Sequence, residues 1–142
     1  MIVRRENIAW VYYIDETKAY DFAEHKVGKW MFFFKDKDFA DRVTKLAVEE
    51  GAVVRAKRSN APTGVCCFYL NCDDDVRHHK VLSFFLEQGL IPKTKSGRLY
   101  NISFKLDDQT LAGEYGLDFH SDIKLSNFVN LDTGKFLKGE GQ

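Results

Sequence analysis

The sequence predicts an α+β fold in which a curved, mostly antiparallel sheet has helices packed on one of its faces. From residue 29 to residue 105 the expected elements run strand, helix, strand, strand, helix, strand, an order typical of this class. The chain has 142 residues, of which 44% are hydrophobic and 14% aromatic. That is enough apolar material for one core but not for two ordinary domains. We therefore expect a single domain over residues 1–142, with a frayed tail at 138–142.

The N-terminal part of this pattern contains two expected strands and a short helix. Residues 8–14 (IAWVYYI) are β-branched and aromatic, which favours a strand. Residues 15–25 (DETKAYDFAEH) predict a short helix with Asp15 as its N-cap. Residues 29–35 (KWMFFFK) predict the next strand, which is apolar on both faces and therefore central in the sheet.

The middle of the chain contains the clearest helices. Residues 36–51 begin with aspartates, space their apolar residues along one helical face and end at a glycine. Residues 73–89 repeat these features. Between them, residues 52–60 and 65–71 predict two strands joined as a hairpin.

The C-terminal part is expected to complete the sheet. Residues 98–106 (RLYNISFKL) alternate apolar and polar side chains, which predicts a half-buried strand. Residues 107–116 predict a short helix or turn. Residues 122–139 predict two closing strands around an LDTGK turn.

Composition and motifs exclude several function classes. The 21 basic and 21 acidic residues give a net charge of zero, so any anion site must be a local cluster. The chain lacks phosphate-binding, dinucleotide-binding and zinc-protease motifs, and we expect no catalytic residue, cofactor or metal. It also lacks a signal-peptide pattern and a membrane span. We therefore expect a cytoplasmic protein with no membrane contact, in which the three cysteines, Cys66, Cys67 and Cys72, stay reduced and buried.

Histidine and aspartate pairs invite a metal interpretation, but simpler roles are favoured. His78 and His79 are adjacent on a helix and point about 100° apart, so they are expected to be solvated polar residues. The aspartates at 73–75 are expected to cap the same helix.

Basic residues on strands are the best candidates for binding. Alternation places Arg55, Lys57 and Ser59 on one face of their strand and Arg58 on the other. Together with Lys29, Lys105 and the neighbouring Arg98 and Tyr100, they could converge on a phosphate or carboxylate. The alternative is that all are ordinary solvent-facing residues.

The aromatic strand adds a possible stacking surface. Trp30, Phe32 and Phe34 share one face, and Met31 and Phe33 share the other. Core packing is favoured for the run as a whole. Trp30, at the start of the strand, is the candidate on which a ligand ring would stack.

Four segments resemble a known family. They read GKWMFFF, AKRSN, GVCCFYLNCDDDVRHHKVLSFFLEQGL and GRLYNISFKLDDQTLAGEYG, and in this order they are similar to the basophilic-leukaemia-expressed protein family, a domain of unknown function. That family is similar in fold to the cap-binding translation initiation factor of the 4E type. The resemblance implies one concave basic pocket formed by Lys29, Trp30, Lys57, Lys105, Gln109, Thr110 and Gly113. The full set of expected ligand-binding residues is therefore Lys29, Trp30, Lys57, Arg58, Ser59, Arg98, Tyr100, Lys105, Gln109 and Thr110.

The function expected from these residues is binding without catalysis. A nucleotide or other phosphorylated small ligand would stack its ring on an aromatic side chain and place its phosphate on Lys or Arg, and the module would sequester a signalling nucleotide. Single-stranded or cap-like RNA binding is the alternative, because the element order is that of an RNA-recognition module. A protein-interaction domain, including self-association, and an enzyme using His120, Lys105 or Tyr115 are further alternatives.

Overall fold

The computed structural model describes residues 1–107 and 123–137. Its strands form one open antiparallel sheet in the order β1-β2-β4-β5-β3-β6, with two α-helices, so the predicted α+β class is confirmed. The elements are β1 (Ile2–Glu6), β2 (Trp10–Asp15), β3 (Val27–Phe34), α1 (Lys37–Glu49), β4 (Arg55–Ser59), β5 (Gly64–Asn71), α2 (Asp75–Gln88) and β6 (Lys105–Leu106), followed by the 3-10 helix η2 (Leu125–Asn127).

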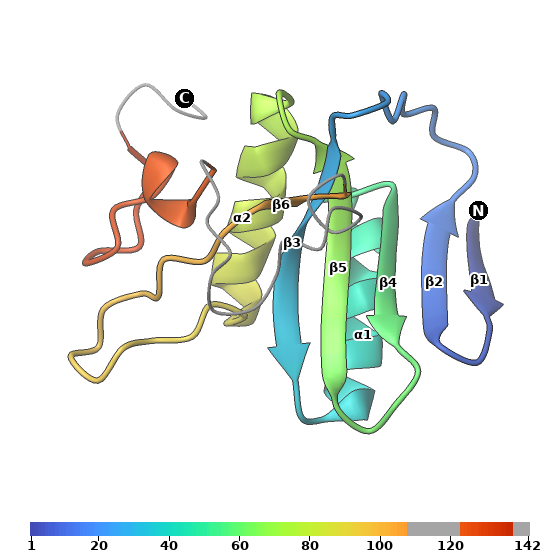
Figure 1. The fold of residues 1–142 in the computed structure, drawn as a ribbon, viewed down its shortest axis with the longest axis horizontal. Coiled ribbons are helices and arrows are strands. Elements are labelled where there is room, and N and C mark those ends of the chain that lie inside the picture. Colours follow the sequence, from blue (N-terminus) through green and yellow to red (C-terminus); the bar gives the residue numbers. More distant parts are fainter. Residues whose placement is uncertain (108–122, 138–142) are drawn as a thin grey trace.

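The central part of the sheet is a split β-α-β arrangement. The segment from β3 to β6 has the order strand, helix, strand, strand, helix, strand, and it places β3 and β5 side by side in the middle. The hairpin of β1 and β2 extends the sheet beyond β4 (Figure 1). No helix of the described residues is long and apolar enough to cross a membrane.

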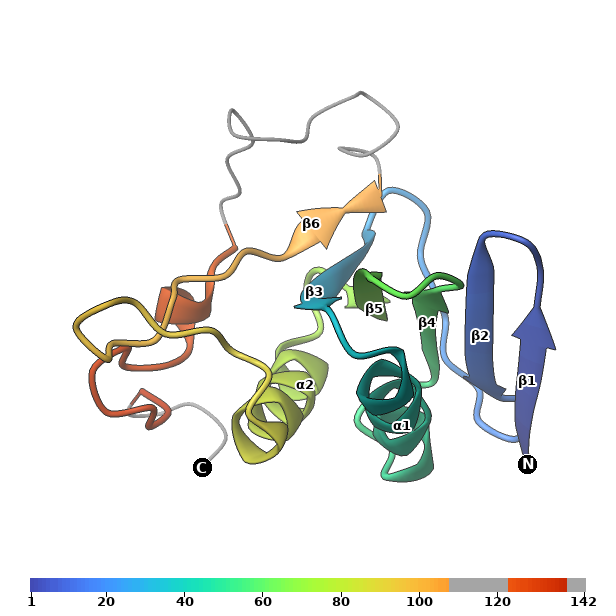
Figure 2. The same ribbon diagram turned by 90° about the horizontal axis from the view of Figure 1, so that it is seen from below.

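Both helices lie on the same face of the sheet, as predicted (Figure 2). The core lies between these two layers, and Trp30, Phe68 and Phe85 are fully buried within it. The other face has no helix in the described part of the chain. We call it the open face.

Local sequence signals determine both helices. The Asp36 side chain accepts hydrogen bonds from the amides of Asp38 and Phe39 at the start of α1, and Asp74 accepts one from the amide of Arg77 at the start of α2. At the end of α2, Gly89 has φ 68°, a left-handed conformation that favours glycine. The predicted helices are confirmed. The capping role predicted for the aspartates at 73–75 is confirmed for Asp74, whereas Asp73 instead pairs with Lys26.

Two predicted elements of the N-terminal part differ from the structure. Residues 16–26 form turns and irregular chain instead of a helix, because Asp15 accepts hydrogen bonds from both the amide and the hydroxyl of Thr17 and so stabilises a turn. Strand β1 was not predicted, and it pairs with β2 along its whole length.

The C-terminal part was predicted to contain more strand than it has. Among its described residues only β6 joins the sheet, where it pairs with Gly28 and Lys29. A side chain on Gly28 would clash with the ring of Phe104, 2.5 Å from an added Cβ, so glycine is required there. Residues 99–104 instead bond to the C-terminal segment, through Phe104 to Ile123, Ile102 to Leu125 and Leu99 to Leu131.

Within residues 123–137, the two closing strands predicted over 122–139 are also not formed. These residues contain η2, a turn and two isolated bridges, one between Lys124 and Ser103 and one between Val129 and Phe136. The turn around 131–134 is held by Asn130, whose side chain accepts hydrogen bonds from the amides of Asp132 and Thr133. The helix or turn predicted over 107–116 lies almost entirely outside the described residues.

Candidate functional site

The open face gathers aromatic and basic side chains from three neighbouring strands. In the antiparallel register Trp10 lies opposite Ser59 and Tyr12 lies opposite Lys57. Side chains at paired positions point to the same face of the sheet. Lys57 is in turn paired with Cys67 on β5, and Tyr69, two residues further along β5, lies on the same face.

Lys57 occupies the centre of this cluster. Its Nζ lies 3.7 Å from the centroid of the Trp10 ring, 5.7 Å from that of Tyr12 and 5.8 Å from that of Tyr69, within the range of cation–π attraction. Burial lowers the pKa of the Lys57 ammonium, and the positive charges of Lys29 and Arg55 act in the same direction. The protein therefore holds this charge where it is less well solvated than on an open surface.

Arg55 is the second cation of the cluster. Its guanidinium carbon lies 4.4 Å from the centroid of the Tyr69 ring and 5.1 Å from that of Phe22. The Nε atom of Arg55 is buried and has no hydrogen-bond partner within residues 1–107 and 123–137. A buried donor without an acceptor is uncommon in folded proteins.

Arg55 and Lys57 share one further property. Within residues 1–107 and 123–137, neither side chain forms an ion pair with a carboxylate, whereas Lys29 on the same face is paired with Asp107 at 2.8 Å. Lys105 lies opposite Lys29 in the register of β3 and β6. We call Trp10, Tyr12, Arg55, Lys57 and Tyr69 the cation–aromatic cluster.

This arrangement has a definite chemical capacity. Two partly buried cations without a carboxylate partner would be stabilised by an anion, and phosphate or carboxylate oxygens form the strongest hydrogen bonds to Lys and Arg. The neighbouring aromatic rings offer surfaces for a planar ring. In contrast, burial raises the pKa of Tyr69 and of the Cys67 thiol, so neither group ionises readily at neutral pH to act as base or nucleophile.

The prediction that Trp30 stacks a ligand is wrong. Trp30 points to the helix side of the sheet, is fully buried and donates a hydrogen bond from Nε1 to Nδ1 of His78 at 3.0 Å. His78 is also fully buried, so its prediction as a solvated residue is wrong as well. Because indole only donates, His78 is the neutral form protonated at Nε2, which bonds to the carbonyl of Cys72.

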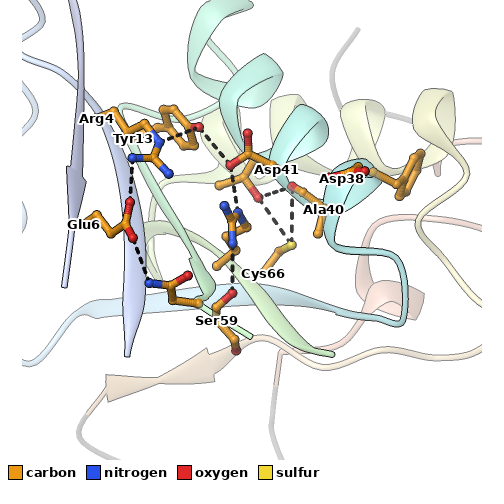
Figure 3. Close-up of polar contacts among 12 residues, drawn as sticks. Arg4, Glu6, Tyr13, Asp38, Ala40, Asp41, Ser59 and Cys66 are labelled. Atoms are coloured by element: carbon orange, nitrogen blue, oxygen red, sulfur yellow. Dashed lines mark hydrogen bonds and ion pairs between the residues drawn. The ribbon is translucent and has the colours of Figure 1, made fainter. Parts of the chain in front are cut away.

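Arg58 also belongs to the helix side, as the strand alternation predicted, and this excludes it from the cluster. Its Nε bonds to Asp41 of α1 at 2.8 Å, and the same carboxylate accepts a hydrogen bond from the Tyr13 hydroxyl. Figure 3 shows the network continuing from Tyr13 to Arg4 and Glu6. Arg58 therefore has a structural role, because its ion pair with Asp41 connects the sheet to α1.

The other predicted residues are spread over the molecule. The Ser59 hydroxyl bonds to the amide of Val65 across the hairpin, and Arg98 pairs with Asp132 at 2.8 Å in a loop on the other side of α2 from β4 (Figure 1). Tyr100 lies with Lys105 along an apolar groove at the edge of β3. Gln109 and Thr110 lie outside the described residues.

The structure thus brings Lys29, Lys57 and Lys105 to one face and adds residues that sequence reasoning missed. These are Trp10, Tyr12 and Tyr69. Arg55 was predicted to share a strand face with Lys57 but was not in the full set of expected ligand-binding residues. The signal for Trp10 and Tyr12 was present as alternation within the predicted strand over residues 8–14, but only the pairing of that strand with β4 brings them to Lys57. Among the described residues, no group of three His, Cys, Asp or Glu is placed to hold a metal ion.

Comparison with known proteins adds no family to this description. No family model and no curated protein matches the chain significantly. The resemblance to the basophilic-leukaemia-expressed family therefore stays a prediction. The cation–aromatic cluster is the structural feature that bears on function.

Proposed function

We propose that the open face binds a phosphorylated ligand with a planar ring, of which a nucleotide is the simplest example. The observation that supports this most strongly is the pair of partly buried cations, Arg55 and Lys57, which have no carboxylate partner in the described part of the chain. A phosphate group would neutralise both charges. The neighbouring aromatic side chains would exclude water from the contacts between the phosphate and the two cations, and these contacts would be stronger as a result.

In this proposal the two kinds of side chain have separate roles. Lys57 and Arg55 hold the phosphate by charge-assisted hydrogen bonds. Trp10 and Tyr12, which are both half-buried, supply the surface for the ring. The module binds and sequesters its ligand without converting it, in keeping with the raised pKa of Tyr69 and Cys67 beside the cations.

A thermal-shift panel of inorganic phosphate and of mono-, di-, cyclic and capped nucleotides tests the proposal. A ligand that binds only the folded protein raises its melting temperature by mass action. We expect at least one nucleotide to do so, and we expect Lys57→Ala to abolish the shift. The matched control is Lys45→Ala, because Lys45 is an exposed lysine of α1. No shift with any member of the panel would contradict the proposal.

The capped nucleotide is included because of the resemblance described for the sequence. Similarity to a family whose fold is like that of the cap-binding initiation factor makes a cap-like ligand a reasonable member of the panel. We also propose a cytoplasmic location, in keeping with three cysteines that are all unpaired.

Single-stranded RNA is a second candidate, and the sheet topology favours it. Strands β3 and β5 are central, as are the base-stacking strands of RNA-recognition modules. On the open face, however, β5 offers only Val65, Cys67 and the nearly buried Tyr69, and the exposed aromatic side chain that β3 presents there is Phe33. Short RNAs in the same panel distinguish the two candidates, since RNA binding weakens steeply with added salt.

A further inference from the structure

Among the residues that the structure describes, one edge of strand β3 has no strand partner over most of its length. Strand β6 pairs only with Gly28 and Lys29, so residues 30–34 have β5 on one side and no strand on the other among the described residues. Alternate residues of a strand direct their backbone N–H and C=O groups to opposite sides. At least two residues of 30–34 therefore present these groups to the free edge, and none of them bonds there to the described chain.

An apolar groove lies along this free edge. It has a volume of about 750 Å³, within the range of small-ligand and peptide pockets. One wall is formed by Met31 and Phe33 of β3 together with Val65 of the neighbouring β5, and the opposite wall is formed by Tyr100 and Ile102. Phe33 and Tyr100 are 71% and 57% exposed, which is unusual for aromatic side chains unless they meet a partner.

Within the described residues, the far wall of the groove is not paired with β3. Leu99, Ile102 and Phe104 already bond to the C-terminal segment through Leu131, Leu125 and Ile123. The groove thus separates β3 from residues 99–104. Its side chains are apolar, and the unpaired backbone groups of β3 along it are polar. An extended chain satisfies both properties, because its backbone pairs with the edge while alternate side chains fill the groove.

We propose that this groove binds an extended peptide segment of a partner protein, which adds to the sheet as a strand beside β3. Five edge residues span roughly 17 Å, so a peptide of about five residues would pair, with apolar side chains at alternate positions. The only charged side chain among the described lining residues is Lys105. Lys105 is itself buried, so apolar side chains rather than charge would select the peptide.

A second copy of this chain fits the groove less well. Two copies pairing edge to edge would each bring their own residues 99–104 against the same strand, and these two walls would collide before the β3 strands met. A peptide without a folded flank has no such wall. Among the described residues, the groove shares none with the cation–aromatic cluster, so peptide binding in the groove is independent of the proposed nucleotide binding.

Selection from a phage-displayed library of random peptides tests the proposal without knowledge of the partner. We expect enrichment of sequences with alternating apolar residues, and we expect Phe33→Glu to weaken the enriched peptides by more than about tenfold, a free-energy change of about 1.4 kcal/mol. Ile8→Glu is the matched control, because Ile8 is an apolar residue that is 96% exposed far from the groove. No enrichment, or equal binding to the Phe33→Glu variant, would overturn the proposal.

A backbone modification separates strand addition from simple apolar contact. One enriched peptide is synthesised in two further versions, N-methylated at odd or at even positions. Strand addition predicts that one version loses binding, because its methyl groups remove the donors that face β3, while the apolar side chains are unchanged. Unchanged binding of both versions would show that the groove does not bind the peptide as a strand.

Discussion

The two faces of the sheet use the same kinds of side chain with opposite outcomes. On the helix side, Trp30 bonds to His78 and Arg58 pairs with Asp41. On the open face, Lys57 lies over the Trp10 ring and Arg55 over the Tyr69 ring, with no carboxylate partner in the described chain. Residues of these types therefore stabilise the fold where a hydrogen-bond or ion-pair partner is present. Where the cations have no carboxylate partner, we propose that they and the aromatic rings beside them are available to bind a ligand.

The largest difference between the faces is expected for the two tryptophans. Trp30→Ala should lower the free energy of unfolding by about 4 kcal/mol, because it leaves a cavity in the core and an unpaired acceptor on His78. Trp10→Ala should cost about 1 kcal/mol, since Trp10 is only half-buried. Urea denaturation of both variants measures the difference. Equal losses would mean that Trp10 is as structural as Trp30.

The next effect concerns the ion pair on the helix side. Asp41→Asn should lower the free energy of unfolding by about 2 kcal/mol, because the buried Arg58 loses its carboxylate. Burial alone would raise the pKa of Asp41, but the hydrogen bonds from Arg58 and Tyr13 outweigh burial and hold it below its usual value. Asp38→Asn, on the exposed first turn of α1, is the control. If the Asp41→Asn variant were as stable as this control, the ion pair between Arg58 and Asp41 would not stabilise the fold.

The buried histidine predicts a pH dependence of smaller size. Burial lowers the pKa of His78 in the folded protein, so below about pH 6.5 the unfolded chain binds a proton more readily than the folded chain. Stability should therefore fall as the pH decreases from about 6.5 towards the folded-state pKa. His78→Gln should reduce this slope, measured by urea denaturation at several pH values.

The control for that slope is an exposed histidine. His25 has a side chain that is 71% exposed and a φ of 66°, and asparagine tolerates this backbone conformation. His25→Asn should therefore leave the pH dependence as it is in the unmodified protein. A slope that disappears in His25→Asn and persists in His78→Gln would contradict the assignment.

The smallest stability effect is expected on the open face. Burial opposes the charge of Lys57, so Lys57→Met should change the free energy of unfolding by less than about 0.5 kcal/mol while it removes nucleotide binding. Lys57→Arg keeps the charge and should retain binding. A loss of stability like that of Asp41→Asn would instead identify Lys57 as a structural residue.

The sequence predicted elements that depend on local signals. Both helices were found because Asp36, Asp74 and Gly89 mark their ends, and β3 to β5 were found from β-branched and aromatic runs. Residues 98–106 were predicted as a full strand because their apolar and polar side chains alternate as in a half-buried strand. Their partner is the C-terminal segment, however, and pairing between distant segments leaves no local signal.

The site was partly predictable for the same reason. Alternation separated Lys57 and Ser59 from Arg58 correctly. It could not show which face of β3 the helices cover, so Trp30 was chosen as the stacking residue although it lies in the core. Trp10 was overlooked because its neighbour in the sheet, β4, is distant in the sequence.

The two tryptophans also provide the most direct test of the difference between the faces. Each indole N–H gives its own cross-peak in a ¹⁵N correlation spectrum, and Trp10→Phe assigns the two peaks. During titration with the nucleotide that gives the largest thermal shift, we expect the Trp10 peak to move and the Trp30 peak, held by His78, to stay in place. A Trp10 peak that stays in place, or movement of the Trp30 peak alone, would contradict ligand binding at the cation–aromatic cluster.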